Sequence, residues 1–108
     1  MTTAPAPIVF FDIAGPDAAK LRDFYAGNFG WEIGGDNLIK TPQLPGTLRQ
    51  DPPEKILYIQ VPDLDAAMAK ITETGGKIVS PKIPIPTGQF VLFTDPAGNR
   101  MGIVGPKK

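Results

Sequence analysis

The side chains able to do chemistry in this 108-residue chain are restricted in type. The sequence contains no Cys and no His, and its serine is Ser80 alone. Thiol nucleophiles, imidazole acid–base catalysis, a Ser-His-Asp triad and zinc sites of the Cys/His type are therefore excluded. Any catalysis would have to use carboxylates, Lys, Arg, Tyr or backbone groups.

Strand alternation selects a small set of such groups. Residues 8–13 and 56–61 each have the composition of a β-strand, and successive side chains of a strand point to opposite faces of the sheet. One face is apolar in both segments and is expected to lie under the helices; it consists of Val9, Phe11, Ile13, Leu57, Ile59 and Val61. The other face is apolar at one end and polar at the other; it consists of Ile8, Phe10, Asp12, Ile56, Tyr58 and Gln60.

A hairpin near the end of the chain adds to the second face. Two β-favouring runs, residues 89–93 and 101–104, flank the turn at 95–99. The proline of that turn presets the backbone, and its glycine and asparagine tolerate positive φ. By alternation, Arg100 and Gly102 lie on the same face as the polar strand ends.

This mixed face suggests a small-molecule site, since pockets combine apolar walls with a few convergent polar groups. The candidate ligand-binding residues are Phe10, Asp12, Trp31, Tyr58, Gln60 and Arg100. The aromatic members would stack on a flat ligand, and the polar members would fix its orientation. The structural alternative is that Asp12 pairs with Arg100 or lies at a solvated strand end, while Phe10 and Tyr58 are core residues. Trp31 would then pack against the preceding helix.

The element that follows the first strand is predicted to be a helix. Gly15-Pro16-Asp17 opens it, with Pro16 at the first helical position and Asp17 near the positive end of the helix dipole. The helix is expected to run to about Ala26 and to end at Gly27. Three short strands with turns between them are expected from there to residue 50.

The same order of elements returns, and a shift of about 48 residues places Asp17 on Asp65. Asp63 has the features of an N-cap, apolar residues follow it at helical spacing, and Gly75-Gly76 would end the helix. A short strand, an extended proline-containing segment and the hairpin complete the copy. The predicted fold is α+β, with two tandem β-α-β-β-β modules that form a curled mixed sheet with the helices on its outer face.

Length and composition limit the other possibilities. We expect one domain over residues 1–108, with modules at about 8–50 and 55–105 and a linker at 51–54. The 11 basic and 11 acidic residues cancel and the basic ones are scattered, so no nucleic-acid partner is expected. No apolar run approaches the ~20 residues that span a bilayer, and no basic signal region begins the chain. A cytoplasmic protein without membrane contact is expected.

Three segments, in this order and spacing, resemble the vicinal oxygen chelate superfamily of glyoxalase, bleomycin-resistance proteins and extradiol dioxygenases. They are FYAGNFGWEI at 24–33, VPDLDAAMAKITETGGKIV at 61–79 and FVLFTDPAGNRMGI at 90–103. The resemblance covers nearly the whole chain except its middle. It implies the glyoxalase-like fold, whereas the activity is left open because this scaffold hosts unrelated chemistries.

The resemblance also implies where metal ligands would lie. In metal-using members, His, Gln or Glu ligands sit on the first strand of each module and on the last strand. The corresponding positions here are Ile8, Ile56 and Gly102, and a fourth, in the first module, is undetermined. Because backbone carbonyls alone do not hold Zn²⁺, Ni²⁺ or Fe²⁺, no metal or other cofactor is expected.

The resemblance therefore implies a metal-free protein that binds a small molecule in the groove of a homodimer and catalyses no reaction. One alternative is a metal-independent lyase or isomerase that uses Asp12, Tyr58 or Arg100 as acid, base or oxyanion stabiliser. A second alternative is a structural or regulatory subunit whose groove is filled by its own aromatic side chains.

Overall fold

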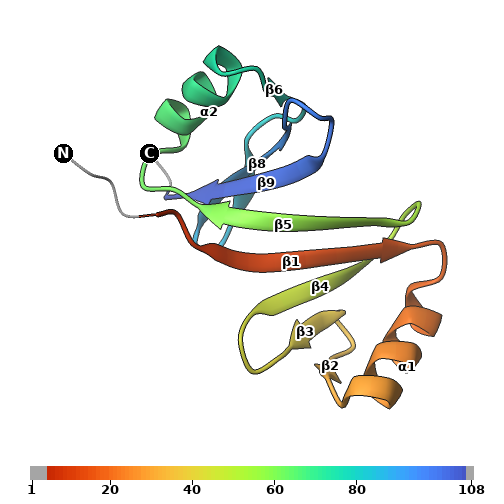
Figure 1. Ribbon diagram of the computed structural model, residues 1–108. Coiled ribbons are helices and arrows are strands. Elements are labelled where there is room, and N and C mark those ends of the chain that lie inside the picture. The colour runs from red at the N-terminus through yellow and green to blue at the C-terminus, as the bar shows by residue number, and fades with distance from the viewer. Residues whose placement is uncertain (1–4, 107–108) are drawn as a thin grey trace. The chain divides into compact units, whose positions relative to one another are not determined.

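The computed structural model describes residues 5–106 and orders its elements as two successive β-α-β-β-β arrangements (Figure 1). The elements are β1 (Ile8–Gly15), α1 (Ala18–Phe29), β2 (Glu32–Ile33), β3 (Leu38–Lys40), β4 (Pro45–Gln50), β5 (Glu54–Gln60), α2 (Leu64–Glu73), β6 (Lys77–Ile78), β7 (Ile83–Ile85), β8 (Gly88–Thr94) and β9 (Arg100–Gly105). The second arrangement carries one additional short strand, β7. The α+β prediction with two tandem modules is confirmed.

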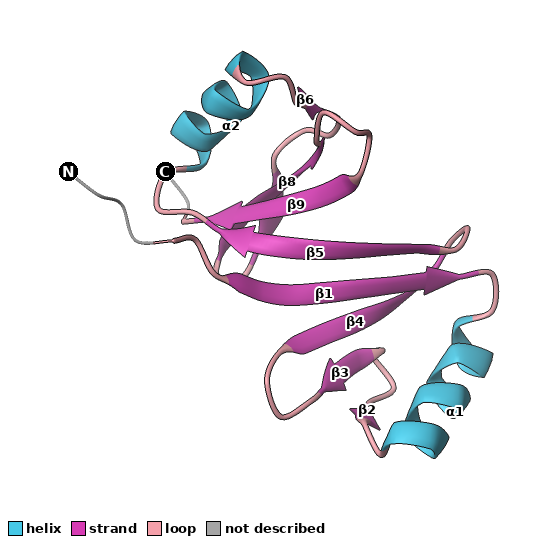
Figure 2. Ribbon diagram, viewed as in Figure 1, coloured by secondary structure: helices cyan, strands magenta, loops and turns pink. Residues whose placement is uncertain are grey.

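Two compact units make up the chain. One unit is Val9–Leu57, and the other combines the segment up to Ile8 with the segment from Tyr58 onward. Within each unit a helix packs against strands of a mixed sheet (Figure 2).

In the first unit the strands lie in the order β2-β3-β4-β1. β1 pairs with β4 in parallel, with Phe11 opposite Gly46, while β3 pairs antiparallel with both β2 and β4. α1 packs against β4 and β2. Ile39 and Leu48 are the largest apolar side chains buried in this unit's strands β3 and β4, at 1% and 4% exposure.

Helix α1 begins two residues later than the sequence suggests. Asp17 is its N-cap, because the Asp17 carboxylate accepts a hydrogen bond from the Lys20 backbone N–H at 3.2 Å. Ala18 is therefore the first helical residue. The prediction that Pro16 occupies the first helical position is wrong, because Pro16 lies before the cap.

The same helix also ends later than predicted. It continues through Gly27 to Phe29, and Gly30 is its C-cap with φ of 68°. The Gly30 N–H donates to the Ala26 carbonyl at 3.0 Å. The prediction that Gly27 ends the helix is wrong, since the left-handed residue that closes the last turn is Gly30.

In the second unit the strands lie in the order β5-β9-β8-β6, and β7 also pairs with β8. β5 pairs with β9 in parallel, with Tyr58 opposite Gly102, and β8 and β9 form an antiparallel hairpin. In the hairpin turn the Asp95 carboxylate accepts hydrogen bonds from the backbone N–H groups of Ala97 and Asn99, both at 2.9 Å. The hairpin prediction is confirmed.

Helix α2 confirms the predicted N-cap at Asp63, whose carboxylate accepts from the Ala66 N–H at 3.1 Å. The helix ends at Glu73 with Thr74 as its C-cap, just ahead of the two glycines that the sequence suggests as its end. The two N-caps, Asp17 and Asp63, are 46 residues apart, so the predicted pairing of Asp17 with Asp65 is wrong.

The core of the second unit lies between α2 and one face of its strands. Its buried residues are Leu64, Val91, Phe93 and Ile103. The partly buried residues packed against them are Ile59, Val61, Ala67, Met68, Ile71, Ile78 and Met101. Ile59 and Val61 thus lie on the helix-covered face, as alternation predicts, whereas Leu57 is exposed.

Candidate functional site

The candidate site in the first unit centres on Asp12 of β1. Among residues 5–106, Asp12 is the one charged or polar residue that is buried, with 2% exposure. It alternates with Phe11, whose ring lies over Gly46, so Asp12 lies on the opposite face of the strand. Phe10, the residue before Phe11, shares the Asp12 face and is half-buried.

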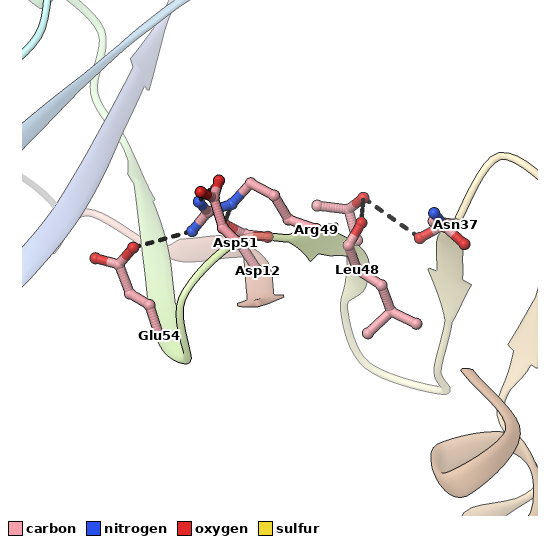
Figure 3. A network of polar contacts seen from close by, with 7 residues as sticks. Asp12, Asn37, Leu48, Arg49, Asp51 and Glu54 are labelled. Carbon is pink, nitrogen blue, oxygen red and sulfur yellow. Dashed lines mark hydrogen bonds and ion pairs between the residues drawn. The ribbon is translucent and has the colours of Figure 1, made fainter. Parts of the chain in front are cut away.

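Arg49 of β4 forms the contacts that hold the Asp12 carboxylate (Figure 3). Its Nε donates to Asp12 Oδ2 at 2.8 Å. Its Nη1 donates to Asp51 Oδ2 at 2.7 Å, and its Nη2 donates to Glu54 Oε1 at 3.0 Å. Each nitrogen of one guanidinium therefore contacts a different carboxylate.

The strand pairing explains why these groups meet. The parallel register places Ala14 beside Arg49, so Arg49 and Asp12 lie on the same face two residues apart along the ladder. After β4 the chain bends at residues 51–53, and the Asp51 N–H donates to the Gly15 carbonyl at 3.0 Å. This bend brings Asp51 and Glu54 back to the same guanidinium.

Burial and charge act in opposite directions on the pKa of Asp12. Burial raises this pKa, the hydrogen bond and charge of Arg49 lower it, and the negative charges of Glu54 and Asp51 raise it; the net direction is upward. Burial alone would lower the pKa of Arg49, but its hydrogen bonds to Glu54, Asp12 and Asp51 raise it. Arg49 therefore stays charged, and Asp12 is a group whose proton affinity the fold increases.

The two oxygens of Asp12 are in different situations. Oδ2 accepts from Arg49, while Oδ1 is buried and has no hydrogen-bond partner among the residues that the structure describes. A buried acceptor without a donor costs about 1–3 kcal/mol. Oδ1 can therefore accept a hydrogen bond from a group other than the residues that the structure describes.

The predicted pairing alternative for Asp12 named the wrong arginine. Asp12 binds Arg49, whereas Arg100 is exposed at the start of β9, opposite Thr94. Sequence reasoning misses Arg49 because it predicts a short strand there without a pairing partner. The signal that could have identified Arg49 is side-chain alternation along its own strand, which lies in the same module as Asp12.

Trp31 lies against the helix. Its ring stacks on Tyr25 of α1, with centroids 5.4 Å apart and planes at 9°, and it also contacts Phe29 and Phe11, at 5.9 Å and 5.7 Å. Because Phe11 and Asp12 alternate on β1, Trp31 and Asp12 lie on opposite faces. These are the helix contacts that a packing role for Trp31 requires.

The second unit contains the other candidate residues. The ring of Tyr58 lies over Gly102, and a Cβ atom at position 102 would overlap the ring carbons Cδ2 and Cε2. Phe90 meets Tyr58 edge to face, with centroids 5.5 Å apart and planes at 87°. Gln60 is exposed, and its backbone N–H donates to the Pro7 carbonyl at 2.9 Å.

Within residues 5–106, no three His, Cys, Asp or Glu side chains are grouped so that they could hold a metal ion. Ile8 is exposed and Ile56 is buried, and neither carries a donor atom on its side chain. No helix in the described part of the chain has the length and apolar character needed to cross a membrane.

Two β-α-β-β-β units, each pairing its first strand in parallel with its last, define a protein of the glyoxalase-like fold. The family model of the Glyoxalase/Bleomycin resistance protein/Dioxygenase superfamily matches residues 7–103. The chain belongs to this superfamily, as the resemblance of its three segments implies.

Two named relatives are distantly related to this chain and are longer than it is. The chain is 27% identical to the anthracycline biosynthesis protein DnrV of Streptomyces peucetius, over 88% of this chain and 45% of that protein. It is 28% identical to the putative glyoxylase CFP32 of Mycobacterium tuberculosis, over 85% of this chain and 42% of that protein. The chain therefore spans less than half the length of these relatives.

A solved structure shares the fold at low identity. The crystal structure of the hypothetical protein BH1468 from Bacillus halodurans C-125 superposes with a TM-score of 0.72, at 12% identity and with 97% of each chain covered. At this identity the likeness shows the fold alone.

Proposed function

We propose that this protein binds a small organic molecule without a metal ion, and that it does so as a homodimer. The observation that carries the proposal is the ring of Tyr58 over Gly102. In metal-using relatives, the position of Gly102 belongs to a Glu ligand, and here an aromatic ring takes the space in which such a side chain would begin. With Ile8 and Ile56 at two further ligand positions, the residues do not fit a cation.

Aromatic and polar side chains would make the ligand contacts. Tyr58 is half-buried against Phe90, which suits a residue that offers an aromatic surface with a hydroxyl at its edge. We assign ligand contacts to the residues that alternation places opposite the helices, and we assign Trp31 to packing against α1. Each unit is considered by itself: the proposed contact residues are Phe10 and Asp12 in the first unit, and Tyr58, Gln60 and Arg100 in the second.

The homodimer is supported by the length of the relatives. DnrV and CFP32 each extend beyond the match by more than the matched length, since 45% and 42% of them are covered. A second copy of this chain would supply a comparable mass of protein. Sedimentation of the intact chain at micromolar concentration should give a dimer, and a monomer would contradict this part of the proposal.

A thermal-shift screen tests the binding function. The intact protein is heated with a panel of flat aromatic acids, alcohols and amines, and separately with Zn²⁺, Ni²⁺, Mn²⁺ or EDTA. A ligand present at 100 times its Kd should stabilise the protein by about 2.7 kcal/mol, whereas the metals and EDTA should leave the melting temperature unchanged. Tyr58→Ala should lose the ligand shift. Stabilisation by a metal and by no organic compound would reject the proposal.

An enzymatic role is the second candidate, and the state of Asp12 favours it. A buried carboxylate whose pKa is raised and whose Oδ1 has no partner among residues 5–106 has the properties of a general base. A base of this kind would exchange a carbon-bound proton of the ligand with solvent D₂O. Exchange that Asp12→Asn abolishes while binding persists would support an enzyme, and binding without exchange would support the binding protein.

A further inference from the structure

The unequal environment of the two Asp12 oxygens points to a missing hydrogen-bond donor. Oδ2 is 2.8 Å from Arg49 Nε, whereas Oδ1 is buried without a partner in the described part of the chain. Buried carboxylate oxygens in folded proteins almost always have a donor from protein or ordered water. A group from outside the described chain is therefore needed to satisfy Oδ1.

Arg49 does not supply this donor in the structure. Its Nε carries a single hydrogen, which is directed at Asp12 Oδ2, and its two terminal nitrogens contact Asp51 and Glu54 at 2.7 Å and 3.0 Å. Each terminal nitrogen carries a second hydrogen, but no guanidinium hydrogen is donated to Oδ1 in this arrangement.

The surrounding charges decide which kind of donor fits. Asp51 and Glu54 are held by the same guanidinium as Asp12, and the negative charge of each raises the pKa of Asp12. A positively charged donor gains from this negative potential, a neutral hydroxyl gains only a hydrogen bond, and an anion is repelled.

We propose that Asp12 Oδ1 anchors the ammonium group of the small molecule that this protein binds, with Arg49, Asp51 and Glu54 as positioning residues. The inference rests on the proposed function and adds to it a ligand class, that of small organic amines. Two other occupants of Oδ1, a bound water molecule and a proton, are outcomes of the test.

Three probes with the same ring and different head groups separate these possibilities. Benzylamine, benzyl alcohol and benzoate are each titrated into the intact ¹⁵N-labelled protein at neutral pH. Benzylamine should shift the amide signals of β1 and β4 saturably and bind at least about tenfold more tightly than benzyl alcohol, a difference of about 1.4 kcal/mol, and benzoate should cause no shift there.

Two matched variants then locate the effect. Asp12→Asn should remove the preference for benzylamine over benzyl alcohol. Asp65→Asn removes the same charge from an exposed position on α2 that pairs with Lys82, and it should leave the benzylamine affinity unchanged. If the two variants lose the same amount of benzylamine affinity, the net charge of the protein attracts the amine. That result would overturn the inference.

The wild-type complex provides a readout that does not depend on variant folding. A crystal structure with benzylamine should place its nitrogen at hydrogen-bond distance from Asp12 Oδ1. A water molecule on Oδ1 in that complex, or an unoccupied Oδ1 with no shift at β1 and β4, overturns the amine inference. The proposed function is judged separately by the thermal-shift panel, and it stands if an acid or alcohol stabilises the protein.

Discussion

The ring of Tyr58 on β5 covers Gly102 on β9, and the two residues are partners in the parallel ladder. A Cβ atom at position 102 would overlap the Tyr58 ring carbons Cδ2 and Cε2, so a large aromatic residue at 58 requires glycine at 102. The first unit repeats the relationship with Phe11 and Gly46, where a Cβ atom would lie 2.5 Å from the ring carbon Cζ. In each unit, a ring from the first strand thus lies over a glycine of the last.

Gly102→Ala should destabilise the protein by about 1–3 kcal/mol, because the added methyl overpacks the contact with Tyr58. Urea unfolding followed by circular dichroism measures this free energy. In the background of Tyr58→Ala the same glycine substitution should cost much less, since the obstructing ring is gone. An equal cost in both backgrounds would show that the ring does not impose the glycine.

Gly27→Ala should have the opposite effect. Gly27 lies inside α1 without a positive φ, is exposed, and has no atom within 4 Å of the place that an added Cβ would occupy. Replacing a helical glycine by alanine at such a site should stabilise the protein by about 0.5–1 kcal/mol. A destabilised variant in the same urea experiment would indicate that the helix ends at Gly27, as the sequence alone suggests.

The elements that can be predicted from the sequence are those with strong local signals. Asp63 is identifiable because a capping side chain precedes an apolar pattern at helical spacing, and the hairpin because its turn residues leave few conformations. The end of α1 has two competing glycines, Gly27 and Gly30. The packing of Phe29 against Tyr25 and Trp31 extends the helix past the first of them, and local sequence does not contain that information.

The site divides in the same way. Alternation along one strand is enough to select Asp12. Its partner Arg49 is 37 residues away and meets it through a parallel pairing of β1 with β4, which has no signature in either segment. The convergence of Asp51 and Glu54 depends in turn on the bend after β4.

Removing Arg49 should be far more damaging than neutralising Asp12. Arg49→Met leaves the Asp12 carboxylate buried without its partner and should cost about 3–5 kcal/mol. Asp12→Asn keeps an acceptor for Arg49 Nε and leaves the guanidinium paired with Asp51 and Glu54, so its cost should be smaller. Unfolding free energies at neutral pH provide the comparison.

The double variant is the control for this asymmetry. Asp12→Asn combined with Arg49→Met removes the buried charge that the arginine neutralises, and it should therefore be more stable than Arg49→Met alone. A double variant whose loss equals the sum of the two single losses would show that the pair is not coupled.

Stability should respond to pH with the sign set by the raised pKa of Asp12. Burial makes the folded protein bind this proton more tightly than the unfolded chain does, for which the ordinary pKa is 3.8. The stability that Asp12 contributes is therefore present below that value and is lost as pH rises through the folded-state pKa. The free energy of unfolding of wild type minus that of Asp12→Asn should therefore fall as pH rises above 3.8.

Asp95 provides a comparison of opposite sign in the same experiment. The side-chain hydrogen bond from Asn99 lowers the pKa of Asp95, together with backbone hydrogen bonds from the turn, so its contribution is present above 3.8 and is lost as pH falls. The difference between wild type and Asp95→Asn should therefore shrink toward acidic pH while the difference for Asp12→Asn grows. If both differences follow the same trend, the pH dependence reflects the net charge of the protein rather than the surroundings of either carboxylate.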